Sequence, residues 1–351
     1  MEANRIRSTA ALADNVIAQD NDDIAIYRAG KRRILTDLVL DNFDIGRFVV
    51  VDVGSDIFSY PPDWVSITHN KITIHAFEVL EDQRLRYTAQ AQNQGIDARY
   101  HPYAIHSSKG TRPFHITCSE GGGSFYPPNA DVVAPLAYPP SPQRTNTLGW
   151  SFARHMTTER TIEFPTITLD EWCEAEGVAD IDFLKVNAQG SESAVLAGGR
   201  MTMQKALGAQ VELQLSRIYR GAPILGDVHL QLDAMGFTLF DCLSPNYCGY
   251  VDAQFYIDPT YNPFYWPRKR MFEGHFMFMR ELLSAESELA KYSFTKCLKL
   301  VCIAEMFGYV EYAFALLEQL KERVEDKSAS TKLAEIATVG RARLSLQLYP
   351  A

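Results

Sequence analysis

The sequence predicts an α/β fold built on a mostly parallel sheet that is covered on both faces. Two observations carry this prediction. First, Phe48 to Val53 and Ile72 to Val79 are nearly continuous apolar runs, which are typical of strands buried on both faces of a parallel sheet. Second, segments with helical periodicity alternate with such runs, and strand–helix–strand crossovers join parallel strands in this way.

The expected elements follow one another in chain order. Residues 1–45 are expected to form a polar, helical lead-in that packs against the main domain. The pattern then predicts strands near residues 48–53, 72–79, 98–105, 113–117, 183–187, 209–215, 237–243, 253–257 and 274–279. It predicts helices near residues 82–94, 169–176, 192–207 and 225–235. Thr168 and Glu171 have capping-box spacing, and Gly95 and Gly177 are placed to end two of the helices.

Three parts of the chain depart from this alternation. Residues 119–165 contain GGGS, YPPN and YPPSP with little periodicity, so we expect a long loop insertion there. The last strands follow one another without a helix, which predicts an antiparallel edge. Residues 281–351 are expected to form a helical hairpin with Cys297 and Cys302 in its core. The main α/β domain then covers residues 46–280.

Composition excludes several classes of protein. Of the 351 residues 46% are hydrophobic, which excludes a mainly disordered chain, and the net charge of −9 weighs against a nucleic-acid surface. The six cysteines lack CxxC spacing and the eight histidines lack metal-ligand spacing, so we expect neither a disulfide framework nor a metal site. No segment has the apolar length of a signal peptide or a membrane span, which predicts a cytoplasmic protein.

Polar residues follow the first two apolar strands. Asp52-Val53-Gly54-Ser55 ends the first strand, and Phe77-Glu78 ends the second. In an open α/β sheet, ligands bind beyond the carboxyl ends of the strands at the point where the strand order reverses. Gly54 permits a tight turn there, and the carboxylate of Glu78 can accept hydrogen bonds from both hydroxyls of a ribose. The GxGxxG spacing of dinucleotide-binding folds is missing, which weighs against a dehydrogenase.

A third segment adds to these two. It reads IDFLKVNAQGSE over residues 181–192, and TLD precedes it at 168–170. Together with VDVGSD (51–56), FEV (77–79) and GF (236–237), it resembles the FkbM-type family of S-adenosylmethionine-dependent methyltransferases. The resemblance covers about residues 45–280 and implies a class I methyltransferase-like, Rossmann-like domain. It also implies O-methylation of a sugar or another small-molecule hydroxyl, as in polysaccharide biosynthesis.

The resemblance assigns roles to individual residues. Asp52, Gly54 and Ser55 would line the methionine end of S-adenosylmethionine, and Glu78 would bind the ribose. Ala104, Ile105 and His106 would lie near the adenine, and Asn187 would face the transferred methyl group. For a general base that serves a hydroxyl acceptor, Glu192, Glu212 and His155 are candidates that the sequence does not rank.

The departures from the family pattern support other hypotheses. The paired acids of the 181–192 motif are Asn187 and Gln189 here, and Phe58 replaces a glycine of the first motif. An amide keeps the hydrogen-bonding shape of a carboxylate but cannot act as a base. The alternative function is therefore a catalytically inactive methyltransferase fold that serves as a binding or scaffold subunit. Its C-terminal helices would be the contact surface. For either function, the C-terminal helices are the expected contact surface of a homodimer. Asp180 and Asp182 also have the D-x-D spacing of nucleotide-sugar transferases, a further hypothesis.

Overall fold

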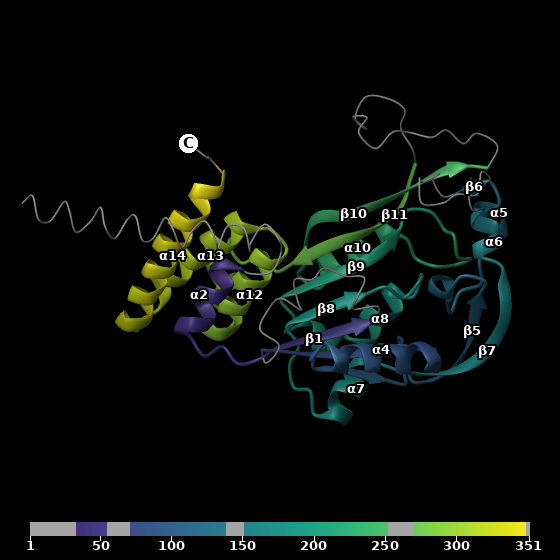
Figure 1. Cartoon of the computed structure of the whole chain (residues 1–351), viewed down its shortest axis with the longest axis horizontal. Coiled ribbons are helices and arrows are strands. Elements are labelled where there is room, and N and C mark those ends of the chain that lie inside the picture. The colour runs from purple at the N-terminus through teal and green to yellow at the C-terminus, as the bar shows by residue number, and fades with distance from the viewer. Residues whose placement is uncertain (1–32, 55–70, 138–150, 252–269, 349–351) are drawn as a thin grey trace, which may run out of the picture.

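A computed structural model describes residues 33–54, 71–137, 151–251 and 270–348 of the chain (Figure 1). The described residues form one large sheet, one small sheet and a group of helices from the two ends of the chain. In Figure 1 the terminal helices lie at one end of the molecule and the small sheet lies at the other. The predicted strand at 253–257, most of the lead-in at 1–32, and Ser55 and Phe58 lie outside the described residues.

The large sheet has the strand order β3-β2-β1-β8-β9-β11-β10-β6. Its strands are β3 (Ala98–His101), β2 (Ile72–Phe77), β1 (Phe48–Val53), β8 (Phe183–Val186), β9 (Gly208–Gln214), β11 (Arg270–Met279), β10 (Thr238–Tyr250) and β6 (Leu136–Ala137). The first five are parallel, whereas β11 is antiparallel to β9 and β10, and β6 to β10. The predicted mostly parallel sheet with an antiparallel edge is confirmed. The strand order reverses at β1 and β8, where a ligand site is expected.

Helices and terminal segments cover both faces of this sheet. One face packs against α7 (Leu169–Glu176), α8 (Glu192–Gly198), α9 (Arg200–Met203) and α10 (Leu225–Ala234). The other face packs against α4 (Glu81–Asn93) and the terminal helices. All residues of β2, β8 and β9 are therefore buried, as the apolar runs predict. The capping box of Thr168 and Glu171 forms at the start of α7, and Gly177 ends that helix with φ of 68°.

The expected loop over residues 119–165 is wrong in part, because this segment contains a long strand. The small sheet has the order β4 (Ala104–Ile105), β7 (Thr158–Ile167) and β5 (Gly110–Thr117). Most side chains of β7 are exposed or half-buried, so the strand carries no apolar run that would reveal it. Between β5 and β7 lie η1 (Glu120–Gly122), α5 (Ala130–Val133), β6 and α6 (Phe152–His155). The expected strand at 98–105 is likewise divided, since β3 and β4 belong to different sheets.

The terminal helices form a larger unit than the expected hairpin. They are α2 (Ile34–Asn42), α11 (Glu286–Leu289), α12 (Phe294–Met306), α13 (Val310–Arg323) and α14 (Lys327–Leu348). Both α12 and α14 pack against α2. The buried carboxylate of Glu305 accepts hydrogen bonds from the backbone N–H groups of Leu35 and Thr36 at 2.8 and 2.7 Å. Cys297 and Cys302 are buried in this unit, as predicted. Among the described residues, no helix combines the length and the apolarity that crossing a membrane requires.

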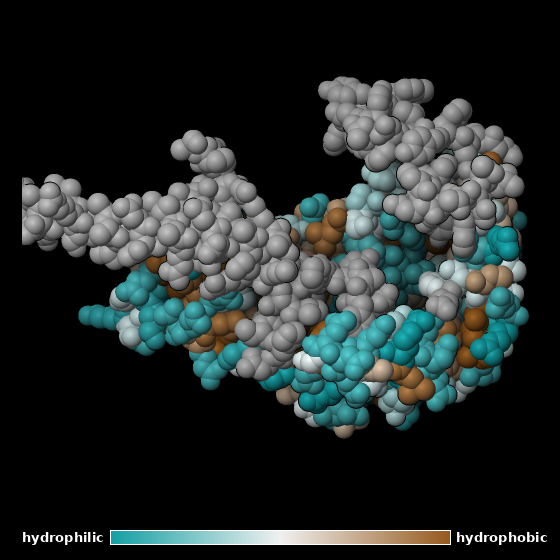
Figure 2. All heavy atoms as spheres, viewed as in Figure 1, coloured by the Kyte–Doolittle hydropathy of each residue, from teal (hydrophilic) through white to brown (hydrophobic). Residues whose placement is uncertain are grey.

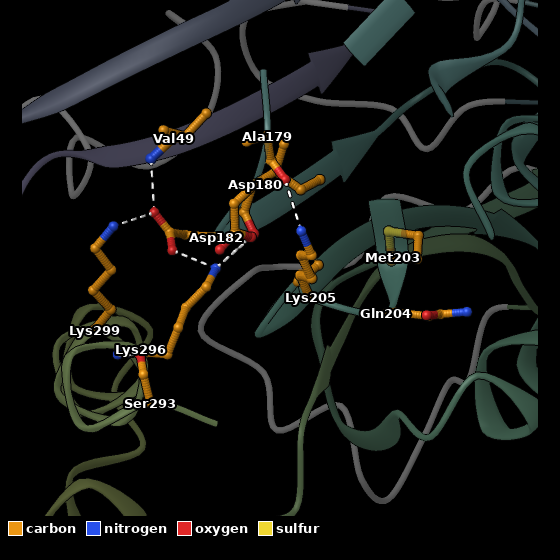
Figure 3. A network of polar contacts seen from close by, with 12 residues as sticks. Val49, Ala179, Asp180, Asp182, Met203, Gln204, Lys205, Ser293, Lys296 and Lys299 are labelled. Atoms are coloured by element: carbon orange, nitrogen blue, oxygen red, sulfur yellow. Dashed lines mark hydrogen bonds and ion pairs between the residues drawn. The ribbon is translucent and has the colours of Figure 1, made fainter. Parts of the chain in front are cut away.

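A buried ion-pair network joins α12 to the amino end of β8 (Figure 3). The carboxylate of Asp182 lies 2.7 Å from Lys296 Nζ and 2.8 Å from Lys299 Nζ, and it accepts a hydrogen bond from the N–H of Val49 at 2.9 Å. Asp180 pairs with Lys296 at 2.8 Å. Both acids of the D-x-D spacing are thus engaged by lysines, and neither is arranged to bind a nucleotide-sugar. They attach the terminal helices to the sheet instead.

Candidate functional site

A cavity of about 550 Å³ lies at the carboxyl ends of β1, β2 and β8. The small sheet forms its outer wall through residues of β5 and β7. Figure 2 shows a hollow between the large sheet and the small one, with hydrophilic side chains on much of its visible wall. Among the residues assigned to the cofactor from the sequence, the structure brings together Gly54, Glu78, Ala104, Ile105 and Asn187 on the wall of this carboxyl-end cavity.

The turn after β1 depends on Gly54. Its φ is +71°, a left-handed conformation that side-chain-bearing residues rarely adopt. A Cβ built on Gly54 would lie 1.8 Å from the carbonyl oxygen of Asn187, so the turns after β1 and β8 touch there. The Gly54 N–H also donates to the carbonyl of Phe77 at 3.1 Å. The absence of a side chain at Gly54 therefore permits the ends of β1, β2 and β8 to lie close together and leaves the cavity beyond these ends open.

Asp52 lies beneath this turn and is not part of the described cavity wall. Its carboxylate lies 2.9 Å from Lys185 Nζ, and both side chains are buried. Lys185 also donates to the carbonyl oxygen of Gly54 at 3.0 Å. Because a buried charge needs a partner, this pair satisfies both ions and fixes the turn from below. Lys185 belongs to the IDFLK motif, but the sequence alone did not assign it a partner.

Glu78 is the buried acid of the cavity wall. Its Oε1 accepts a hydrogen bond from the N–H of Leu80 at 2.9 Å, while Oε2 makes no hydrogen bond within the described residues. Burial raises the pKa of Glu78, and the N–H groups of Leu80 and Val79 partly oppose this shift. One carboxylate oxygen thus remains available to a hydroxyl group in the cavity.

The wall near β4 is apolar. Ala104 and Ile105 are buried, and Phe125 lines the cavity beside them. His106 is buried behind this wall, with its ring edge-on to Phe125 at 5.4 Å between centroids. Burial lowers the pKa of His106 to about 4, so its imidazole is neutral near pH 7. Of the three residues expected near an adenine, two therefore line the cavity and the third packs behind it.

The turn after β8 is organised by Gln189. Its φ of +48° is the one left-handed value found for a non-glycine residue in the described part of the chain. The side-chain amide donates to Asn187 Oδ1 at 2.7 Å and to Glu212 Oε2 at 2.8 Å. The hydroxyl of Tyr219 donates to Gln189 Oε1 at 2.8 Å. Both the nitrogen and the oxygen of this amide are thus engaged, and one of its hydrogen bonds holds Asn187 at the cavity.

Glu192 is buried in the same turn and does not line the described cavity wall. Its Oε1 accepts hydrogen bonds from the N–H groups of Ala188 at 2.9 Å and Gly190 at 3.2 Å. Burial raises its pKa to about 7. In this position Glu192 satisfies backbone donors of the turn, and its assignment as a base stays a prediction.

The other two candidate bases also lie away from the described wall. Glu212 is buried between Gln189 and His275, whose Nε2 lies 3.2 Å from Glu212 Oε1. Burial raises the pKa of Glu212 to about 7, and the charge of Lys185 opposes this shift. His155 is half-buried at the end of α6. The structure therefore brings none of the three candidate bases to the described surface of the cavity.

Several polar residues of the wall were not expected from the sequence, among them Arg160 and Ser191. Arg160, on β7, is the one cationic side chain among the described lining residues, and it has no ion pair within them. Ser191 lines the cavity beside Asn187. Arg160 was missed because its strand was expected to be a loop. Ser191 occupies a position that the family motif leaves open, so no sequence signal pointed to it.

Comparisons with known proteins find methyltransferases. Residues 52–239 match the model of the methyltransferase FkbM domain. The 2-O-methyltransferase NoeI of Sinorhizobium fredii is 37% identical over 60 residues, which are 17% of this chain and 25% of NoeI. This match thus spans a quarter of the length of that relative.

Solved structures of methyltransferases are similar at lower identity. Methyltransferase FkbM from Methylobacillus flagellatus is 12% identical, with a TM-score of 0.34 over 67% of this chain and 44% of that chain. TrmK of M. capricolum, solved with S-adenosyl-homocysteine, is 10% identical, with a TM-score of 0.29 over 89% of this chain and 96% of that chain. The family model covers more than half of the chain, including the turns that build the cavity. The chain therefore belongs to the FkbM methyltransferase domain family.

Proposed function

We propose that the carboxyl-end cavity binds S-adenosylmethionine and that the protein methylates a hydroxyl oxygen of a sugar or another small molecule. The observation that carries this proposal is the convergence of Gly54, Glu78 and Asn187 on one cavity of about 550 Å³. This volume lies within the range of small-molecule sites. When bound, the cofactor supplies a methyl group that is already activated by its sulfonium charge.

The residues of the wall fit such a cofactor. Glu78 has one carboxylate oxygen available for the ribose, and Ala104, Ile105 and Phe125 offer an apolar surface for the adenine. The tight turn at Gly54 leaves the space between Glu78 and Asn187 open for the rest of the molecule. The acidic side chains of the wall, Glu78 among them, outnumber its single cation within the described lining, which suits a positively charged sulfonium.

The cavity wall also suits a polyhydroxylated acceptor. Tyr87 of α4 and Tyr103 offer two aromatic rings, and Thr117 of β5 and Ser119 offer hydroxyl groups. Sugars present both hydroxyls and flat apolar faces, so they match a wall of this kind. The name of the relative NoeI, a 2-O-methyltransferase, points to the same acceptor atom.

We propose that positioning of the acceptor hydroxyl contributes more to the rate of the reaction than general-base catalysis does. Glu212 reaches the Asn187 end of the cavity only through the amide of Gln189, and an amide does not pass on a proton readily. Glu192 is engaged by the backbone of its turn. We therefore propose that the protein mainly positions the acceptor hydroxyl, which can lower a barrier substantially. The oxygen would displace S-adenosylhomocysteine from the methyl carbon, and the hydroxyl proton would pass to solvent water. We place the reaction in the cytoplasm, since all six cysteines are free thiols.

The alternative is a binding or scaffold subunit that has lost the reaction. The neutral side chains of Asn187 and Gln189 favour it, since both replace acids of the family motif. In that case the terminal helices would supply the contact surface, including that of a homodimer.

Calorimetric titration with S-adenosylhomocysteine separates these functions. We expect wild-type protein to bind it and Glu78→Ala to bind it at least about tenfold more weakly, because a charge-assisted hydrogen bond is lost. Glu81→Ala is the matched control, since Glu81 is exposed at the start of α4 and does not line the cavity. Wild-type protein that does not bind would contradict the proposed enzyme and favour the scaffold.

A further inference from the structure

Ser191 carries a buried hydroxyl group that has no partner in the described structure. The residue is 1% exposed, and its Oγ makes no hydrogen bond with any described residue. It lines the carboxyl-end cavity together with Asn187, Ala188 and Gln189. A buried hydroxyl without a hydrogen bond is costly, so native structures rarely keep one without a reason.

The usual local role for this hydroxyl is not taken. Ser191 is the residue before α8, where a serine side chain commonly accepts a hydrogen bond from the first turn of the helix. Here it makes no such bond. The preceding turn is satisfied by the neighbouring Glu192, whose carboxylate accepts from the N–H groups of Ala188 and Gly190. The Ser191 hydroxyl is therefore not used by its own turn or by α8.

The position of Ser191 indicates which part of a ligand it would meet. It follows the turn of Asn187, which touches the turn of Gly54 at the reversal of the strand order. Glu78 lies on the other side of Gly54, because β2 and β8 flank β1 in the large sheet. A cofactor whose ribose lies at Glu78 would therefore extend its amino-acid end across Gly54 toward Asn187 and Ser191.

We propose that the hydroxyl of Ser191 donates a hydrogen bond to the carboxylate of the cofactor's amino-acid end. This inference rests on the proposed function. The amide of Asn187 adds a second donor, because its Nδ2 makes no hydrogen bond within the described residues, whereas its Oδ1 is engaged by Gln189. A carboxylate accepts several hydrogen bonds, so two neutral donors on one wall fit it.

The test compares Ser191→Ala with Ser193→Ala. Ser193 lies two positions further along α8, and its hydroxyl is engaged, donating to Gln231 Oε1 at 2.7 Å. Each variant is titrated with S-adenosylhomocysteine and with methylthioadenosine, which lacks the amino-acid end, and its thermal unfolding is measured without ligand. For Ser191→Ala we expect binding of S-adenosylhomocysteine to weaken about tenfold, as on loss of a hydrogen bond to a charged group. Its binding of methylthioadenosine and its unfolding midpoint should not decrease.

For Ser193→Ala we expect the opposite pattern, with a lower midpoint and unchanged binding of both ligands. Ser191→Ala protein that binds S-adenosylhomocysteine as wild-type protein does would overturn the inference and leave the proposed function intact. Equal weakening of both ligands together with a lower midpoint would also overturn it, since Ser191 would then stabilise the fold. If wild-type protein binds neither ligand, the proposed function itself fails, and the inference fails with it.

Discussion

The two ends of β8 differ in a way that its sequence pattern does not show. Each end opens on a cavity of nearly the same volume, about 550 Å³ at the carboxyl end and about 560 Å³ at the amino end. The amino-end cavity is lined by four cations, and all of them are engaged. Arg280 donates to the carbonyl oxygens of Met203 and Ala206, Lys205 donates to Ala179, Lys291 pairs with Glu288, and Lys296 pairs with Asp180 and Asp182.

The carboxyl-end cavity keeps polar groups without partners. Within the described residues, Arg160 has no ion pair, one carboxylate oxygen of Glu78 accepts no hydrogen bond, and the buried hydroxyl of Ser191 has no hydrogen-bond partner. Volume therefore does not distinguish a ligand site from a packing space in this protein. The distinction lies in whether the polar groups already satisfy one another, since unsatisfied groups are costly unless a ligand completes them.

Substitutions at the amino end of β8 should lower the free energy of unfolding. Asp182→Ala removes the carboxylate that pairs with buried Lys299 and one of the two carboxylates that pair with Lys296, and breaking a buried ion pair in this way costs about 3–5 kcal/mol. We expect the free energy of unfolding to fall by that amount, measured by denaturant titration. Asp180→Ala is the control, because the Asp180 side chain is 41% exposed and Lys296 keeps Asp182. Equal small losses in both variants would contradict a structural role for the network around Asp182.

Substitutions at the carboxyl end of β8 should weaken ligand binding as well as lower stability. Gly54→Ala would place a Cβ 1.8 Å from the carbonyl oxygen of Asn187, so the turns after β1 and β8 must separate. We expect loss of S-adenosylhomocysteine binding and a decrease in unfolding free energy of about 3 kcal/mol, from left-handed strain plus overpacking.

Gly95→Ala is the matched control for this variant. Gly95 also has a left-handed φ, +67°, but a Cβ there would meet no atom within 4 Å. The control therefore bears the backbone strain alone, roughly 1–2 kcal/mol, and should keep its binding. If the two variants lose the same stability, the close approach of the two turns does not matter for the site.

The sequence predicted the fully buried strands β2, β8 and β9, but it missed the mostly exposed strand β7. The apolar runs of β1, β2, β8 and β9 reveal these strands directly, because both of their faces lie in the core. By contrast, most side chains of β7 are exposed or half-buried, and charged residues such as Glu159 and Arg160 interrupt its pattern, so the segment was expected to be a loop. The part of the outer wall that β7 contributes was missed for this reason.

The sequence also did not reveal which side chains form ion pairs with one another. The motif at 181–192 indicates that Asp182, Lys185 and Glu192 matter, but it does not say to which end of β8 each one belongs. Asp182 meets lysines more than a hundred residues later in the chain, and Lys185 meets Asp52. Such pairings depend on tertiary contacts between distant segments, which local spacing does not encode.

The smallest expected effect concerns the amide that replaces the family's acid. Gln189→Glu would restore a carboxyl group but would remove the two hydrogen bonds that the amide donates to Asn187 and Glu212. It would also place a second carboxylate beside Glu212, whose carboxylate lies 2.8 Å from the amide nitrogen in the wild-type protein. Loss of these bonds and burial of unpaired groups should lower the unfolding free energy by about 1–3 kcal/mol at neutral pH.

The loss should grow with pH, and the sign follows from Glu212. Burial raises its pKa from 4.5 to about 7, so the folded state binds more protons than the unfolded chain between these values, and stability falls as pH rises through them. A second carboxyl group raises both pKa values further and extends this loss toward pH ~8. Unfolding measured near pH ~5 and pH ~8 should therefore show a larger deficit for Gln189→Glu at the higher pH. Gln204→Glu makes the same chemical change at an exposed position and should show almost none. If Gln189→Glu matches wild-type stability at pH ~8, Glu212 carries no charge there, and the neutral amide is not required beside it.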